Sequence, residues 1–467
     1  MKGWSTAKRT KVVCTIGPAS ESPRVLGALI REGMDVARLN FSHGTREEHG
    51  RTAHLVRRLA EREGRPVAVL GDLAGPRIRV GRVAEGTVLV PGSRVTVTPR
   101  DVEGDADTIP VSYAGLARDV TRGDALLLAD GAIELRVAGR RGRDLACRVV
   151  VGGPLASHKG LNVPARTLSL PSLTAKDSED LRFAVEEDFD LLAESFVQGP
   201  RDIAAARAGM AAAGRLLPVI AKIERQAALD DLEAILAAAD GAIVARGDLG
   251  VEIPLARVPH AQKRVIRLAN NLAKPVITAT QMLESMVEHP RPTRAEATDV
   301  YNAILDGTDA VMLSEESAVG KHPVEAVRHL TAIAKEAEAG LLSRLGEDEG
   351  EVKAAVGGVA VDLARSLRVA AIVTPTSTGR TPRAIARHRP AQPILALSAD
   401  RRVVRQLALV WGVVPFPVRG ALSLENLTGK AQELVRAEGL AKGSPIVLTM
   451  GYPQGKGLTN MVLVVEA

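Results

Sequence analysis

Residues 219–248 read VIAKIERQAALDDLEAILAAADGAIVARGD, and this stretch has the order of a strand, a helix and a second strand. The runs at 218–224 and 241–246 are apolar and rich in β-branched residues, as buried strands are. Between them, QAALDDLEAILAAA places apolar residues three and four positions apart, which is the spacing of a helix. A helix that joins two buried strands forms the βαβ unit of a parallel sheet.

The same order recurs over most of the chain, with helical stretches such as 203–213 between apolar runs. Eight strands that alternate with helices favour a closed (β/α)8 barrel over an open, doubly wound sheet. The eight predicted strands are residues 11–16, 36–41, 66–72, 191–197, 218–224, 241–246, 275–280 and 310–314.

Two segments depart from this pattern. Between the third and fourth strands the chain reads TVLV, RVTVT, ALLLADGAIELRVAG and LACRVVV, with Asp130-Gly131 as a predicted hairpin turn. After GEDEGE at 346–351, a second alternation begins with candidate strands AAIVT, PILAL, VVPF, PIVLT and MVLVV. We therefore predict an α/β fold: a barrel at 1–76 and 166–340, an inserted all-β lid domain at 77–165, and a C-terminal α/β domain at 341–467.

The composition is that of a globular protein, with 46% hydrophobic and 25% charged residues among 467. The N-terminal MKGWSTAKRTK has no apolar core and no run reaches membrane-spanning length, so we expect a cytoplasmic protein without a membrane partner. Cys14 and Cys147 lack the spacing of metal ligands, which favours reduced thiols. The net charge of +6 is dispersed, which argues against a nucleic-acid partner.

Polar side chains follow nearly every predicted barrel strand, where catalytic groups of such barrels lie. Lys222 and Glu224 share one face of their strand, and buried charges there are costly unless they are paired or bind a ligand. Glu224 and Asp248 end neighbouring strands and suit Mg²⁺, while Lys222 and Arg38 offer positive charge to a phosphoryl or carboxylate oxygen. A metal and fixed cations are what phosphoryl transfer requires, although a structural ion-pair network remains an alternative for any single strand.

Six motifs resemble those of pyruvate kinases: KVVCTIGPAS, GMDVARLNFSHGT, VIAKIER, DGAIVARGDLGVEIP, KPVITATQMLESM and RPTRAEATDVYNAILDGTDAVMLSEES. The resemblance runs from about residue 10 to the C-terminus and includes ASHKGLNVP and STGRTPRAIARHRP. It implies transfer of the phosphoryl group of phosphoenolpyruvate to ADP, giving pyruvate and ATP in glycolysis. It also implies Mg²⁺ or Mn²⁺ as cofactor and a homotetramer.

The resemblance implies roles for residues at the strand ends and in the lid. The implied catalytic residues are Lys222, Arg38, Thr280 and Ser314, and the two hydroxyls serve a water-linked route that protonates the enolate. The implied substrate-binding residues are Arg38, Gly247, Asp248 and Thr280. The implied nucleotide-binding residues are Asn40, Phe41, Ser42, His43, Arg79 and Lys159. Glu224 and Asp248 are the implied Mg²⁺ ligands, and a helix expected to begin near Asp248 offers N–H groups to the substrate carboxylate.

A hydroxyl- and glycine-rich turn in the C-terminal domain reads TSTGRT. Its backbone N–H groups and hydroxyls suit a phosphate nest, although an ordinary helix N-cap has the same composition. The resemblance implies that this loop binds a phosphorylated allosteric effector beside GYPQGKGLTN at 451–460. The loop consists of Thr376, Ser377, Thr378, Gly379, Arg380 and Thr381.

Two other functions remain open. A metal-dependent aldolase acting on pyruvate or phosphoenolpyruvate would share the carboxylate pair but would not need the nucleotide residues or the lid. A non-catalytic sensor of sugar phosphates or nucleic acid fits the pI of 9.4. A sensor would have no need for the complete set of Lys222, Glu224, Asp248 and Thr280.

The sequence departs from the family pattern near the predicted site. Glu194 stands where a small residue is usual, and Glu315 replaces a glycine in SEES. At 72–79 the chain reads DLAGPRIR where the family commonly has DTKGPEIR, so Leu73, Ala74 and Arg77 replace a threonine, a lysine and a glutamate. The family's K⁺ site corresponds to Asn40, Ser42, Asp72 and Leu73.

We predict that the enzyme does not require K⁺, because Arg77 brings a permanent positive charge to this region. A guanidinium about 6 Å from the K⁺ site, at an effective dielectric of about 20, would repel K⁺ by roughly 3 kcal/mol, on the order of a hundredfold in affinity. Activity should persist in K⁺-free buffer with a bulky organic counter-cation, and Arg77→Glu should make it K⁺-dependent. A strict K⁺ requirement of the unmodified enzyme would contradict this prediction.

Overall fold

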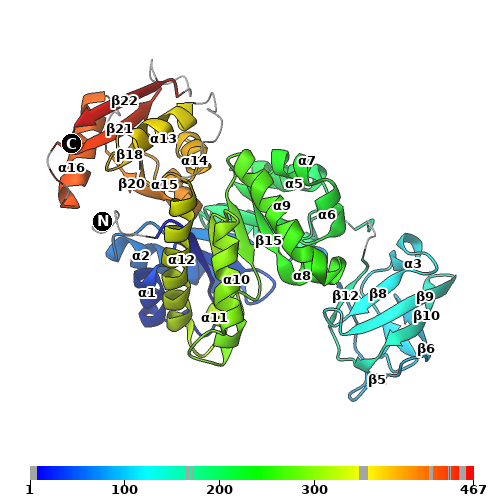
Figure 1. Cartoon of the computed structure of the whole chain (residues 1–467). Helices are drawn as coiled ribbons and strands as arrows, with labels where there is room; N and C mark the ends of the chain where they lie inside the picture. The colour runs from blue at the N-terminus through cyan, green and yellow to red at the C-terminus, as the bar shows by residue number, and fades with distance from the viewer. Residues whose placement is uncertain are drawn as a thin grey trace.

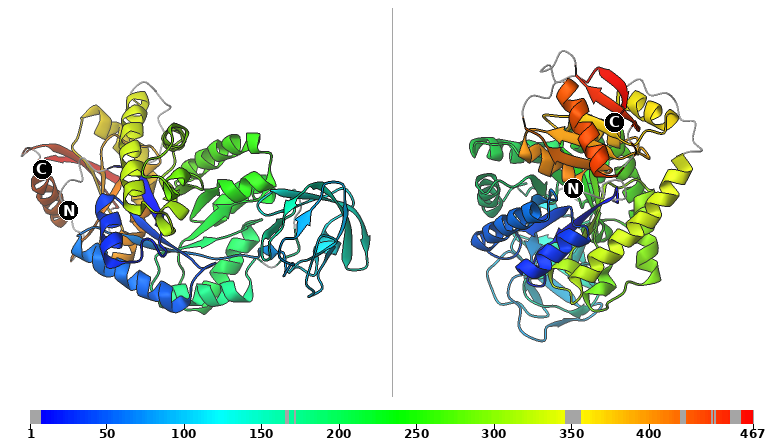
Figure 2. Two further views of the ribbon diagram at one scale, coloured as in Figure 1. Left: turned by 90° about the horizontal axis from the view of Figure 1, so that it is seen from below. Right: turned by 90° about the vertical axis from the view of Figure 1, so that its left-hand side faces the viewer.

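The computed structural model describes residues 8–164, 168–170, 172–345, 356–419, 424–439, 441, 443–451 and 459–466. A barrel occupies the middle, with a β-rich unit at one end and a second α/β unit at the other (Figures 1 and 2). Within the described ranges, no helix has the combination of length and apolar character that a membrane crossing requires.

Eight parallel strands close into the predicted barrel in the order β1-β17-β16-β15-β14-β13-β3-β2. They are β1 (Lys11–Thr15), β2 (Val36–Asn40), β3 (Ala68–Asp72), β13 (Leu191–Glu194), β14 (Val219–Ile223), β15 (Gly241–Ala245), β16 (Val276–Ala279) and β17 (Ala310–Leu313). All except β3 end one to three residues before the predicted position. Phe196 and Thr280 show the reason: their φ angles of 57° and 75° are left-handed and cannot continue a strand.

Helices surround the barrel (Figure 1). They are α1 (Pro23–Glu32), α2 (Arg46–Arg62), α4 (Ala175–Glu186), α5 (Pro200–Ala212), α6 (Gln226–Asp230), α7 (Leu232–Ala238), α8 (Arg246–Glu252), α9 (Val258–Asn271), α10 (Arg294–Leu305), α11 (Glu315–Ala318) and α12 (Pro323–Leu345), with short 3₁₀ turns η1 (Leu255–Arg257) and η2 (Glu284–Val287). The single helix expected in QAALDDLEAILAAA is two helices, because Asp231 interrupts it between α6 and α7.

The N-terminal end of the barrel is closed by the C-terminal unit. Ala408 and Leu409, in the 3₁₀ turn η3 (Leu407–Leu409), pack into the same apolar cluster as interior barrel residues such as Val13 and Ile243. Arg405 fixes this contact from the side, since its Nε lies 2.7 Å from Asp190 Oδ1 at the start of β13. Only the C-terminal ends of the strands therefore remain open to a substrate.

The β-rich unit between β3 and β13 has its own apolar core. Its seven-stranded sheet has the order β4-β12-β8-β9-β10-β6-β7, and β11 pairs with β5 separately. Leu128 pairs with Ile133 across the turn that contains Asp130-Gly131, which confirms the predicted hairpin. The elements are β4 (Ile78–Arg79), β5 (Val88–Leu89), β6 (Arg94–Thr98), β7 (Thr108–Pro110), α3 (Leu116–Asp119), β8 (Ala125–Leu128), β9 (Ile133–Arg141), β10 (Asp144–Val151), β11 (Gly153–Pro154) and β12 (Gly160–Asn162).

The C-terminal unit is a five-stranded sheet in the order β20-β19-β18-β21-β22, and all five predicted strands are present. The strands are β18 (Ile372–Pro375), β19 (Ile394–Ser398), β20 (Val413–Pro417), β21 (Pro445–Met450) and β22 (Met461–Glu466). Its helices are α13 (Val356–Ser366), α14 (Arg380–Ala386), α15 (Arg401–Gln406) and α16 (Leu424–Ala437). An α/β barrel, a β-rich insertion and a C-terminal α/β unit are the fold that the sequence predicted.

A tight glycine in β3 gives a test of barrel packing. A Cβ added to Gly71 would lie 2.9 Å from two ring carbons of Phe41 and 3.1 Å from Phe189 Cδ1. We expect Gly71→Ala to destabilise the protein by about 1–3 kcal/mol, because buried rings must shift. Gly139→Ala in β9 is the matched control, since a Cβ there meets nothing within 4 Å. Equal thermal unfolding midpoints for the two variants would contradict the packing argument.

Candidate active site

A cleft of about 380 Å³ opens at the C-terminal ends of the barrel strands, on the side of the β-rich unit. Its lining brings together many of the residues predicted from sequence. Those residues are Arg38, Asn40, Ser42, Arg79, Lys222, Glu224 and Asp248. Arg77, which departs from the family pattern, also lines the cleft, as does Ser195, one of the polar residues expected at the strand ends. Lys176 lines it as well, although the sequence did not assign it to the site.

Four buried charges form the floor of this cleft. Lys222 Nζ lies 2.9 Å from Glu224 Oε1 and 3.5 Å from Asp72 Oδ1. It also donates a hydrogen bond to Ser195 Oγ at 2.8 Å. Arg38 donates from Nε to Asp72 Oδ2 at 2.6 Å. Lys222 and Glu224 are thus paired on one strand face, as the sequence required of buried charges there.

The charges hold one another in their ionised forms. Burial by itself lowers the pKa of Lys222, but Asp72 and Glu224 raise it above its ordinary value. Burial by itself raises the pKa of Asp72, but Lys222 and Arg38 bring it below its ordinary value. The floor of the cleft therefore presents a fixed ammonium group rather than a titrating amine.

Glu224 differs from Asp72, because its pKa is raised. Burial is the largest cause, Lys222 opposes it, and the neighbouring Asp248 adds to the rise. Glu224 Oε2 accepts the N–H of Phe196 at 2.6 Å, but Oε1 is buried without an aligned hydrogen bond. A cation between Glu224 and Asp248 would relieve their repulsion.

This donor set fits Mg²⁺, which usually takes one or two carboxylates and completes its shell with water and substrate oxygens. Among the described residues, no three His, Cys, Asp or Glu side chains are arranged to hold a metal. The two-carboxylate arrangement suits a metal that is shared with a phosphorylated substrate, rather than a fully protein-enclosed metal.

Arg77 does not point away into solvent. Its Nη2 lies 3.3 Å from Asp248 Oδ1 and 3.2 Å from Asp130 Oδ1. Asp130 belongs to the hairpin of the β-rich unit, whereas Asp248 belongs to the barrel. The guanidinium therefore bridges the two units at the candidate metal site, a contact that sequence spacing alone did not reveal.

Thr280 and Gly247 lie in contact at the ends of neighbouring strands. A Cβ on Gly247 would lie 2.7 Å from Thr280 Cγ2, so a larger residue at 247 would displace the threonine. Arg246 Nη2 donates to Thr280 O at 2.7 Å and fixes the left-handed backbone there. Ser314 follows the adjacent strand β17, and its N–H donates to Glu316 Oε2 at 2.7 Å. Helix α8, expected near Asp248, begins at Arg246.

The predicted nucleotide-binding residues are only partly gathered. Asn40, Ser42 and Arg79 line the cleft, whereas His43 and Lys159 are exposed and lie outside its lining. Phe41 is buried, with its ring 5.7 Å from that of Phe189, and it too lies outside the lining of the cleft.

Lys176 was missed by the sequence reasoning. Its Nζ donates to Phe41 O and to Asp180 Oδ2, both at 2.5 Å, from the first turn of α4. A positive charge in the first turn of a helix is unfavourable with the helix dipole. This unfavourable position was the sequence signal that could have suggested another role for Lys176.

Comparisons with known proteins bear on the same residues. Residues 7–327 match the family model described as pyruvate kinase, barrel domain, and residues 354–465 match pyruvate kinase, alpha/beta domain. The chain belongs to the pyruvate kinase family. A pyruvate kinase of Geobacillus stearothermophilus is 45% identical, covering 98% of this chain and 80% of the relative. That of Corynebacterium efficiens is 44% identical, covering 97% of this chain and 97% of the relative. That of Thermococcus litoralis is also 44% identical, covering 96% of this chain and 96% of the relative.

Pyruvate kinases are phosphotransferases of glycolysis, and this chain is such an enzyme.

The predicted effector loop lies between β18 and α14. Thr376 Oγ1 accepts the N–H of Gly379 at 2.8 Å and the N–H of Thr378 at 3.4 Å. The loop therefore already satisfies two of its own N–H groups. Most of GYPQGKGLTN lies outside the described residues, but Thr459 near its end hydrogen-bonds Thr381 through the two hydroxyls.

The two departures from the family pattern differ in their surroundings. Glu315 is exposed at the start of α11. Glu194, at the end of β13, is only 1% exposed, and neither of its carboxylate oxygens has a hydrogen-bond partner. Burial, followed by the nearby Asp202 and Asp177, raises the pKa of Glu194 to about 8. The side chain is therefore largely protonated at neutral pH.

Glu194 should make stability fall as the pH rises. Unfolded, its carboxyl titrates near the ordinary pKa of 4.5, whereas the folded chain keeps the proton up to about pH 8. The folded state therefore binds more protons in that window, and the unfolding free energy decreases from pH 4.5 to 8. We expect Glu194→Gln to unfold at a higher temperature than the unmodified enzyme at pH 8, with the gap closing near pH 4.5. Glu315→Gln, at an exposed site, is the control; a pH-independent gap for Glu194→Gln would contradict the assignment.

Proposed function

We propose that the cleft transfers the phosphoryl group of phosphoenolpyruvate to ADP, with Lys222 stabilising the group in transit. The observation that carries this role is the position of the ammonium on the cleft floor. Asp72 and Glu224 keep it charged, and Ser195 directs one of its protons. A preorganised cation that faces developing charge lowers the barrier without reorganisation during the reaction.

Glu224 and Asp248 are proposed to hold Mg²⁺ or Mn²⁺, because they are neighbouring carboxylates and because burial, together with Asp248, raises the pKa of Glu224. When bound, the metal supplies positive charge to the phosphoryl oxygens and the developing enolate. Arg77 already contacts Asp248, so it must share or release this carboxylate when a metal binds.

Arg38, Gly247, Asp248 and Thr280 are proposed to bind phosphoenolpyruvate, and Thr280 and Ser314 to serve enolate protonation. The contact between Gly247 and Thr280 supports a shared subsite. The proposed nucleotide side comprises Asn40, the backbone of Phe41, Ser42, His43, Arg79 and Lys159. Arg79 and Lys159 lie on and beside β4 and β12, and movement of this unit as a lid would bring them nearer to the barrel.

K⁺ independence is proposed on the position of Arg77. Its guanidinium lines the same cleft as Asn40 and Ser42, and it supplies a fixed positive charge in that space. Of the other two residues of the family's K⁺ site, Asp72 is already neutralised by Arg38 and Lys222. Leu73 offers its backbone carbonyl, which Ser195 Oγ already contacts at 2.7 Å.

The remaining proposals rest on the family alone. They are a phosphorylated effector at Thr376–Thr381, a homotetrameric assembly and a cytoplasmic location. The domain boundaries proposed are 1–76 and 166–340 for the barrel, 77–165 for the lid and 341–467 for the C-terminal domain.

Lys222→Met should nearly abolish turnover and leave substrate binding comparatively intact. The ammonium acts mostly on charge that develops in transit, so its loss should cost at least about 3 kcal/mol in the barrier, a decrease of more than about a hundredfold in kcat. A coupled assay of ATP formed from phosphoenolpyruvate and ADP measures this directly. A variant that keeps most of its turnover would remove Lys222 from the mechanism, and an unmodified enzyme that forms no ATP would overturn the proposed function.

Glu224→Gln and Asp248→Asn should each raise the Mg²⁺ concentration needed for half-maximal activity, because each removes one formal charge from the site. Mn²⁺ binding without substrate, followed by electron paramagnetic resonance, should weaken in parallel. Glu315→Gln is the charge-matched control at an exposed position. Unchanged Mn²⁺ binding in both variants would exclude direct ligation.

A further inference from the structure

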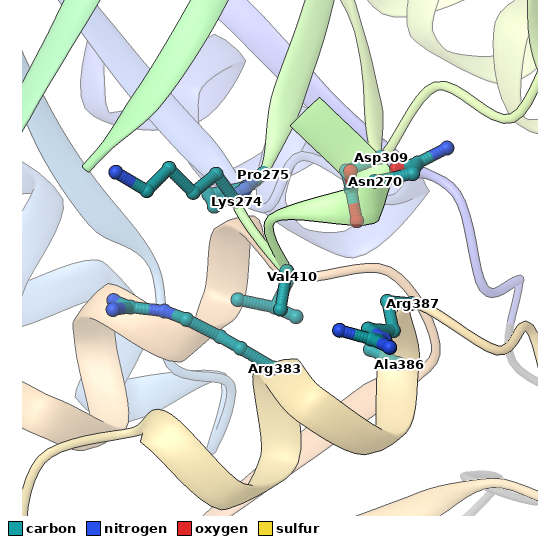
Figure 3. Close-up of a pocket in the computed structure, with 9 residues that line it drawn as sticks. Asn270, Lys274, Pro275, Asp309, Arg383, Ala386, Arg387 and Val410 are labelled. Carbon is teal, nitrogen blue, oxygen red and sulfur yellow. The ribbon is translucent and has the colours of Figure 1, made fainter. Parts of the chain in front are cut away.

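A second cavity lies far from the active-site cleft, where the C-terminal unit meets the N-terminal end of the barrel. The barrel supplies Lys274 and Pro275, which precede β16, and Asp309, which precedes β17. The C-terminal unit supplies Arg383 from α14 and Arg387 just after it. Figure 3 shows the Lys274 and Arg383 side chains running alongside one another from opposite sides of the interface.

The acidic groups around this cavity are already occupied. Asp309 accepts from Arg389 at 2.9 Å and from the N–H groups of Val276 and Trp411. Asp240, the acid that acts on Arg383 and Lys274 at longer range, is paired with Arg207 at 2.6 Å and accepts the N–H of Val219.

The basic groups are not matched in the same way. Lys274 Nζ donates to three carbonyl oxygens at the end of α7, those of Leu236, Ala237 and Ala239, and to no carboxylate of a described residue. Arg387 makes one hydrogen bond, at 3.3 Å, to Asn271 O. Arg383 Nε is buried without an acceptor, and none of its guanidinium nitrogens forms an ion pair within the part of the chain that the structure describes. Three cations thus face one cavity whose described carboxylates are already engaged.

Arg383 is half-buried, and its Nε is buried without an acceptor. Such unmatched groups are generally satisfied by an ion or by water. Burial accordingly lowers the pKa of Arg383, and Asp240 offsets this only in part. From the cavity, the three basic side chains that line it and the lack of a free carboxylate there among the described residues, we propose that this interface binds an anion bearing a phosphate group. The proposal concerns a site separate from the cleft and does not depend on the roles assigned there.

The shape of the cavity limits the ligand. About 10 Å³ is enclosed, roughly the room of one water-sized group, and the empty space widens toward solvent to about 190 Å³ in all. One phosphate oxygen fits inside, with the rest of the phosphate on the solvent side of the cavity. Guanidinium groups favour phosphate because they offer several donors in a planar fork. Inorganic phosphate and the phosphate of a monoester share this chemistry.

The location ties the site to regulation. The cavity lies at the start of β16 and β17, whose other ends lead to Thr280 and Ser314. On the other side, Arg383 Cζ lies 3.7 Å from the point that a Cβ of Gly379 would occupy, so the guanidinium packs against the turn before α14. An anion here would bridge the barrel and the C-terminal unit through one arginine.

The test compares unfolding with and without inorganic phosphate. Without phosphate, Arg383→Gln should unfold at the same temperature as the unmodified enzyme or higher, because it removes a charge that contacts no acid among the described residues. With phosphate, it should lose most of the stabilisation, and the phosphate dissociation constant should rise at least about tenfold. Arg365→Gln, an exposed change on α13, is the charge-matched control. Phosphate bound in the active-site cleft contributes equally to all three proteins.

Additional variants and anions distinguish this cavity from the effector loop and from a general effect of salt. Thr381→Glu blocks the proposed effector loop and should leave the Arg383-dependent phosphate binding intact. If phosphate binding is lost in Thr381→Glu but retained in Arg383→Gln, the proposal is overturned. Arg387→Gln should weaken phosphate binding in the same direction, which keeps the test valid if Arg383→Gln does not fold. Equal stabilisation by chloride, or a lower unfolding temperature of Arg383→Gln without phosphate, would refute a phosphate site.

The source of the phosphate group is decided by comparing two ligands. A hexose monophosphate that binds the cavity more tightly than inorganic phosphate identifies a monoester ligand, and the reverse order of affinity identifies the free ion. Either order supports the site as long as Arg383→Gln weakens the tighter of the two ligands. Binding of both ligands that is unchanged in Arg383→Gln and Arg387→Gln would place the phosphate elsewhere and overturn the proposal.

Discussion

The pairing of Lys222 with Asp72 and Glu224 is the interaction on which the catalytic end of the barrel depends. An ammonium group at this depth is stable only because two carboxylates surround it, and Asp72 is in turn held by Arg38. Removing any one member leaves an uncompensated buried charge, which is far more costly than losing an exposed ion pair. The same balance keeps Lys222 protonated at the floor of the cleft.

The barrel makes this arrangement possible because one end is closed by the C-terminal unit and the other end forms the cleft. Ala408 and Leu409 close the N-terminal end with apolar side chains, so solvent and ligands meet the charged floor only from the other end. Most strands then carry a polar group at or immediately after their last residue, such as Asp72 of β3, Glu224 after β14 and Thr280 after β16. The β-rich unit stands over these groups, and Arg77 joins it to the barrel through Asp130 and Asp248.

Periodicity and turn chemistry were sufficient to predict the barrel, the insertion, the Asp130-Gly131 hairpin and the C-terminal strands, because each depends on local pattern. The strand ends were placed too late, since left-handed residues such as Phe196 end a strand without any change in hydrophobicity. The bridge from Arg77 to Asp248 joins residues 171 positions apart, and pattern carries no such information. Motif resemblance led to the hypotheses about Lys222 and its neighbours, whereas the burial that protonates Glu194 follows only from tertiary packing.

Two groups of arginines illustrate how a protein distributes buried charge. At the open end of the barrel, Arg38 and Arg77 each face a carboxylate, so the site is electrostatically balanced before any ligand arrives. A metal or substrate must therefore exchange with existing pairs, and that exchange favours ligands whose charges match the pattern. At the closed end, Arg389 has Asp309, whereas Arg383 has no acid in contact among the described residues. The free-energy cost of leaving Arg383 without an acid is present in every molecule that has no ligand. An anion that pairs with Arg383 removes this cost, and this adds to its binding free energy.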